Sequence, residues 1–479
     1  MSSARLLAIL AISLILALPL NAEDSSASAA ERLERLEQAV QQLQQRNAEL
    51  EKEVRSLKQK ATAGSTSHAR PTPPAPHDEP SPSTNEKNVV AEDNLIERLQ
   101  RTVFAAAGAS EFKLTLGGFI QAQFDAGDVS AFEGRFGSGV SELKDRFRLR
   151  RARLYITGAY EDDFDFKIEG EYQQTDASGT ARLPNFTRTG VGALDVYINW
   201  STFPEVNVKA GQYKAPFGLE QITSDPKLYT LERSLVTTAL TPERQVGVQF
   251  WGKPFATIWP EQKERLTYFA GIFNGTGRNI VGNDNNEFMY VGRGEVLALQ
   301  TELGRHELTL KIGGNGLWSR DDGGTTISSV LFLNPDGSLS SFAPASAAER
   351  TAYGADLALR FGQFDLAAEY ISERVRSRHV AGAEPQFSSF RADGYYIQGS
   401  YFVIPKKLQL LAKWESFNPG QLAHDDIISV TAGINYYIRG DDLKLMAAYI
   451  HTWSELRQHS SVFDDAEFDQ FLARLQLMF

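Results

Sequence analysis

Five arginines crowd one short stretch of this 479-residue chain. Within the run Lys144–Tyr155 they are Arg146, Arg148, Arg150, Arg151 and Arg153. Guanidinium groups this close repel one another unless anions or carboxylates screen them, and their planar shape suits two-point contact with phosphate or carboxylate. The stretch therefore has two interpretations. It is an anion path, or it is a wall neutralised by the acidic residues of the next segment, Asp165, Glu169 and Glu171.

Other kinds of chemistry find little support in the sequence. The chain has no Cys, which excludes thiol catalysis, iron–sulfur clusters and disulfides. No His stands near a Ser and an acid in a recognisable motif, and the run Asn283–Glu287 lacks the spacing of a calcium-binding EF-hand loop. The net charge of -11 argues against nucleic acid as a partner. We expect no enzyme activity, no cofactor and no metal site.

The elements that position the arginines are strands. From about Phe112 apolar residues alternate with polar or small ones, and a period of two places them on opposite faces of a strand. Mean hydropathy is -0.30 and only the N-terminus has a long apolar run, which excludes a bundle of membrane helices. About sixteen alternating segments are centred near residues 119, 152, 168, 197, 209, 249, 269, 293, 312, 357, 369, 398, 411, 432, 448 and 474. The pattern predicts an all-β transmembrane barrel of about sixteen antiparallel strands, since a membrane strand needs only ~9–11 residues.

A barrel of this size has a water-lined interior, so the facing of each arginine matters. The apolar residues that follow the cluster, Ala152 and Leu154, are expected to face lipid, which directs Arg151 and Arg153 into the lumen. The earlier arginines then require a β-bulge or a place beyond the bilayer, because an arginine facing lipid at mid-bilayer costs roughly 2–4 kcal/mol.

The N-terminal part has a different organisation. Residues 1–22 read as a signal peptide, with an uncleaved membrane anchor as the alternative. Residues 23–60 carry a heptad of apolar residues with charged flanks, which predicts an α-helical coiled coil rather than one helix lying on a domain. Val at heptad position a, Leu at position d and one Asn favour a dimer. Residues 61–94 are a Pro-rich linker, 95–111 a short helix or connector, and 112–479 the barrel.

The last residues alternate up to Phe479 at the carboxylate. A terminal aromatic on an amphipathic last strand resembles the assembly signal of bacterial outer-membrane barrels. This resemblance implies the barrel-assembly machinery as a partner, the Gram-negative outer membrane as the location and its lipid as the surroundings, with the coiled coil in the periplasm. A soluble β-sandwich is the alternative, but it would not need a secretion signal and a terminal Phe together.

Several stretches resemble the phosphate-selective porin O/P family of Gram-negative outer membranes. In chain order they are Phe147–Gly158, Leu194–Trp200, Val208–Leu219, Leu231–Ser234, Thr241–Gly247 and Tyr268–Gly275. The resemblance implies a sixteen-stranded barrel, usually a trimer, in which one long loop folds inward and narrows the pore.

In this sequence that loop would leave its strand near Gln212–Phe217 and return near Thr241–Val246. Its first turn would be formed by Tyr213, Pro216, Phe217 and Gly218. The family's anion path uses Arg and Lys side chains, and its counterparts here are Arg151, Arg153, Lys209, Lys214, Arg233 and Arg244. With Arg146, Arg148, Arg150 and Lys167 they form the expected pore lining. A trimeric barrel would make the heptad a three-stranded coil, overriding the preference for a dimer.

Three functions remain open from the sequence. The first is passive diffusion of small anions such as phosphate through a pore narrowed by the inward loop. The second is a general, weakly selective porin. The third is a structural envelope connector that reaches peptidoglycan through its coiled coil.

Overall fold

The computed structural model describes residues 112–136, 143–160, 163–172, 191–280, 282–283, 285–322, 331–333, 339–341, 348–378, 389–420, 422–458 and 466–479. The signal peptide, coiled coil, linker and connector predicted over residues 1–111 lie outside the described residues. Within the described part, no helix is long and apolar enough to cross a membrane.

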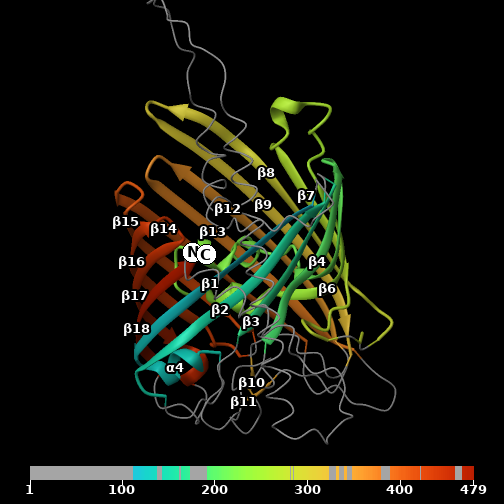
Figure 1. Ribbon diagram of the computed structural model, residues 1–479. Helices are drawn as coiled ribbons and strands as arrows, with labels where there is room; N and C mark the ends of the chain where they lie inside the picture. The colour runs from blue at the N-terminus through green and yellow to red at the C-terminus, as the bar shows by residue number, and fades with distance from the viewer. Residues whose placement is uncertain are drawn as a thin grey trace, which may run out of the picture. The chain divides into compact units, whose positions relative to one another are not determined.

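Sixteen strands of the described chain close into one antiparallel barrel (Figure 1). All sixteen predicted centres lie inside these strands. The first half of the barrel contains β1 (Phe112–Gly127), β2 (Arg146–Tyr160), β3 (Phe164–Tyr172), β4 (Val191–Phe203), β5 (Val206–Lys214), β6 (Arg244–Gly252), β7 (Leu266–Phe273) and β8 (Met289–Leu303). The second half contains β9 (His306–Asp321), β12 (Ala348–Phe361), β13 (Phe364–Ser377), β14 (Phe390–Ile404), β15 (Leu408–Asn418), β16 (Ile427–Arg439), β17 (Leu443–Ser454) and β18 (Glu467–Met478).

The remaining elements are short. A separate two-stranded sheet pairs β10 (Leu331–Leu333) with β11 (Leu339–Ser341). The helices are α4 (Val129–Glu133), α5 (Leu219–Ile222), η1 (Asp225–Lys227), α6 (Leu235–Leu240), η2 (Pro260–Gln262) and α7 (Glu455–Gln458). Of these, α5, η1 and α6 belong to the connection between β5 and β6.

The barrel closes where the first strand meets the last. β1 pairs with both β2 and β18. The backbone N–H of Gly118 donates to the Phe479 carbonyl at 2.9 Å, and the Phe479 N–H donates back to Gly118 at 3.0 Å. The terminal residue therefore joins the ladder that seals the barrel, at the end where the first strand begins.

The two ends of the barrel differ in the length of their connections. At the end that holds Phe112 and Phe479, β12 and β13 are joined by residues 362–363 and β16 and β17 by residues 440–442. At the opposite end the connections are longer, including residues 215–243 and 378–389. Outer-membrane barrels have short periplasmic turns and long extracellular loops, so Phe112 and Phe479 lie at the periplasmic end.

A β-bulge in β2 allows the arginines on both sides of it to point into the lumen. Gln121 of β1 pairs with Arg151, but Ala122 pairs with Leu149, so Arg150 is an extra residue in β2. The bulge reverses the alternation, and Phe147 is 85% exposed on the outer wall while Arg148 turns inward to Asp125. The predicted bulge is confirmed, and no arginine of the cluster faces lipid.

The connection between β5 and β6, residues 215–243, folds into the barrel and is named the inward segment. Its apolar residues Phe217, Leu235 and Val236 are buried against the inner wall. That wall contributes Leu317, Ala352, Ile371, Ala392, Tyr396 and Phe417, which lie on β9 and β12–β15. The expectation of an entirely water-lined interior is wrong on this side, because α6 covers the inner wall and forms a dry core with it.

Candidate functional site: a charged constriction held by the inward segment

On one side, the inward segment is bound by carboxylates of the wall. The Glu369 side chain on β13 accepts the backbone N–H of Leu219 at 2.7 Å and that of Glu220 at 3.2 Å. Glu415 on β15 accepts the N–H of Leu235 at 2.7 Å. Each bond is made at the first turn of a short helix, where backbone N–H groups have no helical partner. The acidic wall therefore holds the inward segment through its backbone.

On the opposite side, the inward segment supplies the carboxylates and the wall supplies the arginines. Arg150 of β2 binds both oxygens of Glu232, with Nε–Oε1 at 2.8 Å and Nη2–Oε2 at 2.7 Å. Arg474 of β18 binds Glu232 at 2.7 Å and the Leu231 carbonyl at 2.5 Å. One loop glutamate thus joins the strands on both sides of β1.

Asp225 of η1 is the centre of a second cluster. It forms ion pairs with Arg151 at 3.2 Å, with Arg153 at 2.5 Å and with Arg233 at 2.5 Å. Burial by itself would raise the pKa of Asp225, but Arg151, Arg233 and Arg153 hold it well below its ordinary value. Asp225 therefore stays ionised at neutral pH.

The electrostatics of Glu232 follow the same rule. Burial raises its pKa, yet Arg150 and Arg474 outweigh burial and hold the pKa well below the ordinary glutamate value. A buried carboxylate that remains ionised needs such partners, because an unpaired buried charge costs several kcal/mol (roughly 3–5 kcal/mol when one partner is removed).

The remaining predicted arginines of β2 lie near the extracellular end. Arg146 and Arg148 both pair with Asp125 of β1, at 3.0 and 2.8 Å. Both also pair with Glu133 of α4, at 2.7 and 2.8 Å. They therefore bind the first strand and the helix that follows it, apart from the Asp225 cluster.

Two of the remaining predicted cations share a carboxylate. Lys167 and Arg244 both pair with Asp195, at 3.4 and 2.7 Å, and Lys167 also pairs with Glu169 at 2.9 Å. Lys214 donates to the carbonyls of residues 221 and 223. Lys209 lies over the rings of Tyr197 and Tyr213, 4.4 and 5.5 Å from their centroids.

The predicted first turn of the loop is a packing element. Tyr213 and Phe217 are buried, and the rings of Tyr213 and Phe273 meet edge to face at 5.6 Å. Gly218 has φ +82, and a Cβ placed there would lie 2.9 Å from the Glu369 carboxylate. Pro216 is also buried, so these four residues shape the base of the segment.

The paired arginines and carboxylates of the interior differ in their contact with water. The Arg150 side chain is 27% exposed and Glu232 9%; Arg146 is 29% exposed and Asp125 1%. Arg233 is 14% exposed and Asp225 2%. Arg153 and Glu171 are both nearly covered. In these three unequal pairs water reaches the cation more than its carboxylate.

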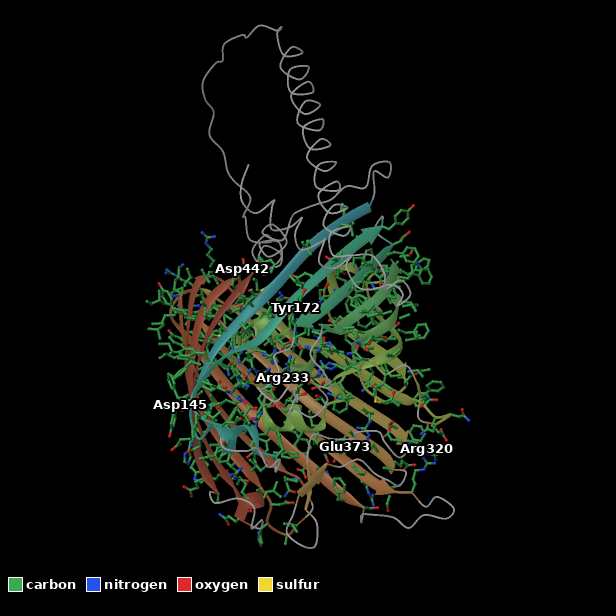
Figure 2. All side chains as sticks on the ribbon, turned by 60° about the horizontal axis from the view of Figure 1, so that its bottom comes forward. Asp145, Tyr172, Arg233, Arg320, Glu373 and Asp442 are labelled. Carbon is green, nitrogen blue, oxygen red and sulfur yellow. The ribbon has the colours of Figure 1, made fainter. Side chains whose placement is uncertain are left out.

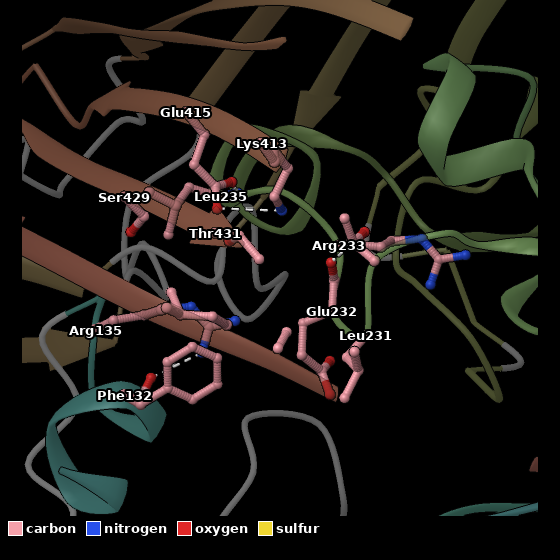
Figure 3. A pocket seen from close by; sticks show the side chains of 13 residues that line it. Phe132, Arg135, Leu231, Glu232, Arg233, Leu235, Lys413, Glu415, Ser429 and Thr431 are labelled. Atoms are coloured by element: carbon pink, nitrogen blue, oxygen red, sulfur yellow. Dashed lines mark hydrogen bonds and ion pairs between the residues drawn. The ribbon is translucent and has the colours of Figure 1, made fainter. Parts of the chain in front are cut away.

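A small pocket lies beside the inward segment, between its residues Leu231–Leu235 and the inner wall (Figure 3). Lys413 and Glu415 of β15 line one side, and Phe132 and Arg135 from α4 and the turn after it line the other (Figure 3). Lys413 pairs with Glu415 at 3.2 Å. No group of three or more His, Asp or Glu among the described residues could hold a metal ion.

Reasoning from the sequence missed several charged residues of the interior. Asp225 balances three arginines, and Arg474 binds Glu232 from the last strand. Lys311 of β9 is exposed and alternates with Leu310 and Ile312, of which Ile312 is 48% exposed on the outer wall. The alternation around Lys311 could have identified it as facing the lumen. Nothing local in the sequence marks Asp225 as the partner of β2. Figure 2 shows Arg233 inside the barrel.

The fold and the interior together define the class of protein. A closed sixteen-strand antiparallel barrel, with an apolar outer wall, a charged interior and one segment folded into the lumen, is an outer-membrane porin. The chain belongs to the family described as phosphate-selective porin O and P, whose model matches residues 120–479. This membership points to a channel rather than an enzyme.

Comparison with individual proteins gives more distant similarities. The chain is 22% identical to porin O of Pseudomonas aeruginosa over 424 residues, covering 77% of this chain and 89% of that protein. OmpT of Vibrio cholerae, in its in-vitro folded trimer form, has 12% identity and a TM-score of 0.48, covering 77% of this chain and 100% of that one. The outer-membrane channel DcaP of Acinetobacter baumannii has 12% identity and a TM-score of 0.46, covering 78% and 99%.

Proposed function

We propose that this porin conducts small anions such as phosphate by passive diffusion, with a preference for anions set at the inward segment. The supporting observation is the unequal exposure of Arg150 and Arg233 relative to their carboxylate partners. Arg146 has the same inequality nearer the extracellular end. A permeating ion meets guanidinium groups whose partners lie behind them. Polar groups that partly replace the hydration shell of an ion determine which ions pass.

The acidic side of the constriction does not offset this preference. The carboxylates of Glu369 and Glu415 are 2% and 4% exposed and are occupied by backbone N–H groups of the inward segment. Asp225 and Glu232 are occupied in the same way by arginines. At Arg150 and Arg233 the charge that a solute contacts is therefore mainly positive.

The test is the reversal potential of the purified protein in a planar bilayer across a KCl gradient. We expect a chloride-signed potential that Arg150→Ala and Arg146→Ala each reduce, and current block on addition of phosphate. Lys263→Ala is the matched control, because Lys263 is exposed on the periplasmic turn between β6 and β7. A near-zero potential without block would contradict anion preference.

A general porin with weak selectivity is the second candidate. It is favoured by the ion pairs of the cluster, since Arg150, Arg151 and Arg153 each bind a carboxylate. Under this alternative the arginines only fasten the inward segment. Their substitution would then change the size of the conductance and leave the reversal potential unchanged.

We also propose a homotrimer surrounded by outer-membrane lipid, with Phe479 read by the barrel-assembly machinery. Phe479 is 43% exposed at the closing strands, where a receptor could contact it before closure. Residues 23–94 would form the periplasmic coiled coil and spacer, in contact with peptidoglycan. Deleting residues 23–94 should lower trimer stability and cell-wall co-sedimentation; unchanged values would contradict a connector role.

A further inference from the structure

Four arginines lie together on the outer wall near the ends of β9, β13 and β14. They are Arg320, Arg374, Arg376 and Arg391, named here the outer arginine patch. On β9 Arg320 alternates with buried Ser319 and Asp321, and on β13 Arg374 follows buried Glu373. Alternation on a strand therefore directs the patch away from the lumen.

The strand register places the patch in two neighbouring rows. The outermost row reads across β9, β12 and β13 as Arg320, Glu349 and Arg376. The next row reads across β9, β12, β13 and β14 as Trp318, Thr351, Arg374 and Arg391. The two rows together hold four arginines and one carboxylate.

Arg374 and Arg391 are directly opposite each other on adjacent strands. Like charges at directly opposite positions destabilise a sheet. Both side chains are exposed. Arg391 donates to the Ser372 hydroxyl at 2.8 Å and to the hydroxyls of Tyr353 and Tyr370, all of which are neutral groups. An anion between the two guanidinium groups would relieve this repulsion.

The nearby carboxylates neutralise the patch only in part. Glu349 is shared by Arg320 at 3.3 Å and Arg376 at 3.5 Å. Glu287 pairs with Arg320 at 3.1 Å. Asp393 lies one row further from the strand ends and accepts the Tyr370 hydroxyl at 3.3 Å.

The position of the patch is the outer boundary of the membrane. Its strands lead into the connections at residues 322–347 and 378–389, at the extracellular end. Arg320 and Asp442, which lies in a periplasmic turn, are toward opposite ends of the barrel (Figure 2). Rows below the patch contain tyrosines and then apolar side chains, which are Tyr353, Tyr370, Tyr395, Leu357, Ile397 and Trp414. Tyrosine is enriched at the level of lipid headgroups.

The patch is local. At the same end of the barrel, the outer positions of β15, β17 and β18 in the described chain are Asn418, His451, Trp453, Glu467 and Asp469. None of them is Arg or Lys. The cationic surface therefore covers one sector of the wall, which indicates a binding site rather than a general feature of the rim.

We propose that the outer arginine patch binds the phosphorylated headgroup of a lipid in the outer leaflet. Guanidinium groups bind phosphate through two parallel hydrogen bonds, and their weak hydration favours contact at an interface. The tyrosines below the patch would lie against the headgroup boundary while the acyl chains follow the apolar wall. This site is separate from the lumen and does not depend on the ion preference of the channel.

The test uses full-length protein in detergent, delipidated and incubated with diphosphorylated lipid A, with dephosphorylated lipid A as the comparison probe. Native mass spectrometry reports the bound lipid. We expect the wild type to retain the diphosphorylated form, and Arg374→Ala/Arg391→Ala to lose at least about fivefold of it, which corresponds to ~1 kcal/mol. Conductance should not change, because both arginines are outside the lumen.

The matched control is Lys263→Ala/Arg265→Ala, which removes two exposed cations at the periplasmic end. Equal retention by the patch variant and the wild type would overturn the proposal, as would equal binding of the dephosphorylated probe. If the double variant does not fold, the single substitution Arg374→Gln, which removes the charge and keeps a polar side chain, must still lower retention. If the patch binds inorganic phosphate but retains no lipid, it is a site for free anions, and the proposal is overturned.

Discussion

Arg150 and Glu232 form a two-point ion pair between the bulge of β2 and the inward segment, with contacts of 2.8 and 2.7 Å. Because Arg150 is the extra residue of the bulge, the irregularity in the wall directs this side chain toward the segment. The same glutamate binds Arg474 of β18. One loop carboxylate therefore couples the position of the segment to the strands on either side of β1.

Replacing Glu232 with Gln keeps the shape and removes the charge. Arg474 is almost fully buried, so its unpaired charge should destabilise the docked segment by roughly 3–5 kcal/mol. We expect larger and noisier single-channel currents in planar bilayers, since the segment would leave its docked position more often. Glu261→Gln, on the exposed turn between β6 and β7, should behave like the wild type.

Replacing Asp225 with Asn removes the shared partner of Arg151, Arg153 and Arg233. Removing one negative charge near the path should favour anions by about 1 kcal/mol at roughly 4 Å in water. We therefore expect the anion-to-cation permeability ratio to rise about fivefold. The reversal potential in a KCl gradient measures this ratio. A shift toward potassium would contradict the prediction.

The pH dependence of docking follows from the lowered pKa values of Asp225 and Glu232. A carboxylate with a lowered folded pKa stabilises fully above its unfolded pKa of about 4 and loses that contribution as the pH falls through the folded value. We expect the anchors at Asp225 and Glu232 to hold between about pH 8 and pH 5, and to release the segment only below about pH 4. The Asp225→Asn/Glu232→Gln variant should lack this acid transition, which conductance measured as a function of pH will reveal.

Gly218→Ala should weaken the base of the inward segment. Its φ of +82 disfavours any residue with a Cβ, at about 1–2 kcal/mol, and the new Cβ would displace the Glu369 carboxylate from the first turn of α5. The temperature at which the barrel unfolds, measured from the change in its gel mobility after heating, should fall by a few degrees. Gly282→Ala is the control, because a Cβ there meets nothing within 4 Å.

Lys311 offers a test of the interior outside the arginine clusters. It is exposed on the inner face of β9 and makes no ion pair with any described residue. Lys311→Gln should therefore reduce anion preference without changing thermal stability. An unchanged reversal potential would place the ion path away from β9.

The strands and their order could be predicted from the sequence because a period of two is a local property. Three arginines on a lipid face would be too costly, so either a bulge or a place beyond the bilayer was also predictable for them, but the sequence did not specify that the bulge lies at Arg150. The partners of those arginines were not predictable. Asp225 lies in an irregular segment whose place in the lumen depends on contacts with distant strands, and no periodicity specifies such contacts.

The dry core under α6 was missed for a different reason. On β13, Ala367, Ile371 and Val375 face inward while Leu366, Ala368 and Tyr370 face outward. Both faces therefore carry apolar side chains beside charged ones such as Glu369 and Arg374, and alternation cannot tell which face is covered by protein. The predicted coiled coil and its role stay predictions, as do the anion-binding roles of the arginines.

The attachment of the inward segment to β18 also sets an order of events during biogenesis. Residues 215–243 leave the ribosome long before Arg474 and Gln476. Nevertheless, Arg474 binds the Leu231 carbonyl and the Glu232 carboxylate, and Gln476 binds the Pro226 carbonyl. The inward segment can reach its final form only after the last strand is in place. Closure of the wall and docking of the segment are thus one maturation step, and a barrel halted before its final hairpin would lack this anchor for the segment.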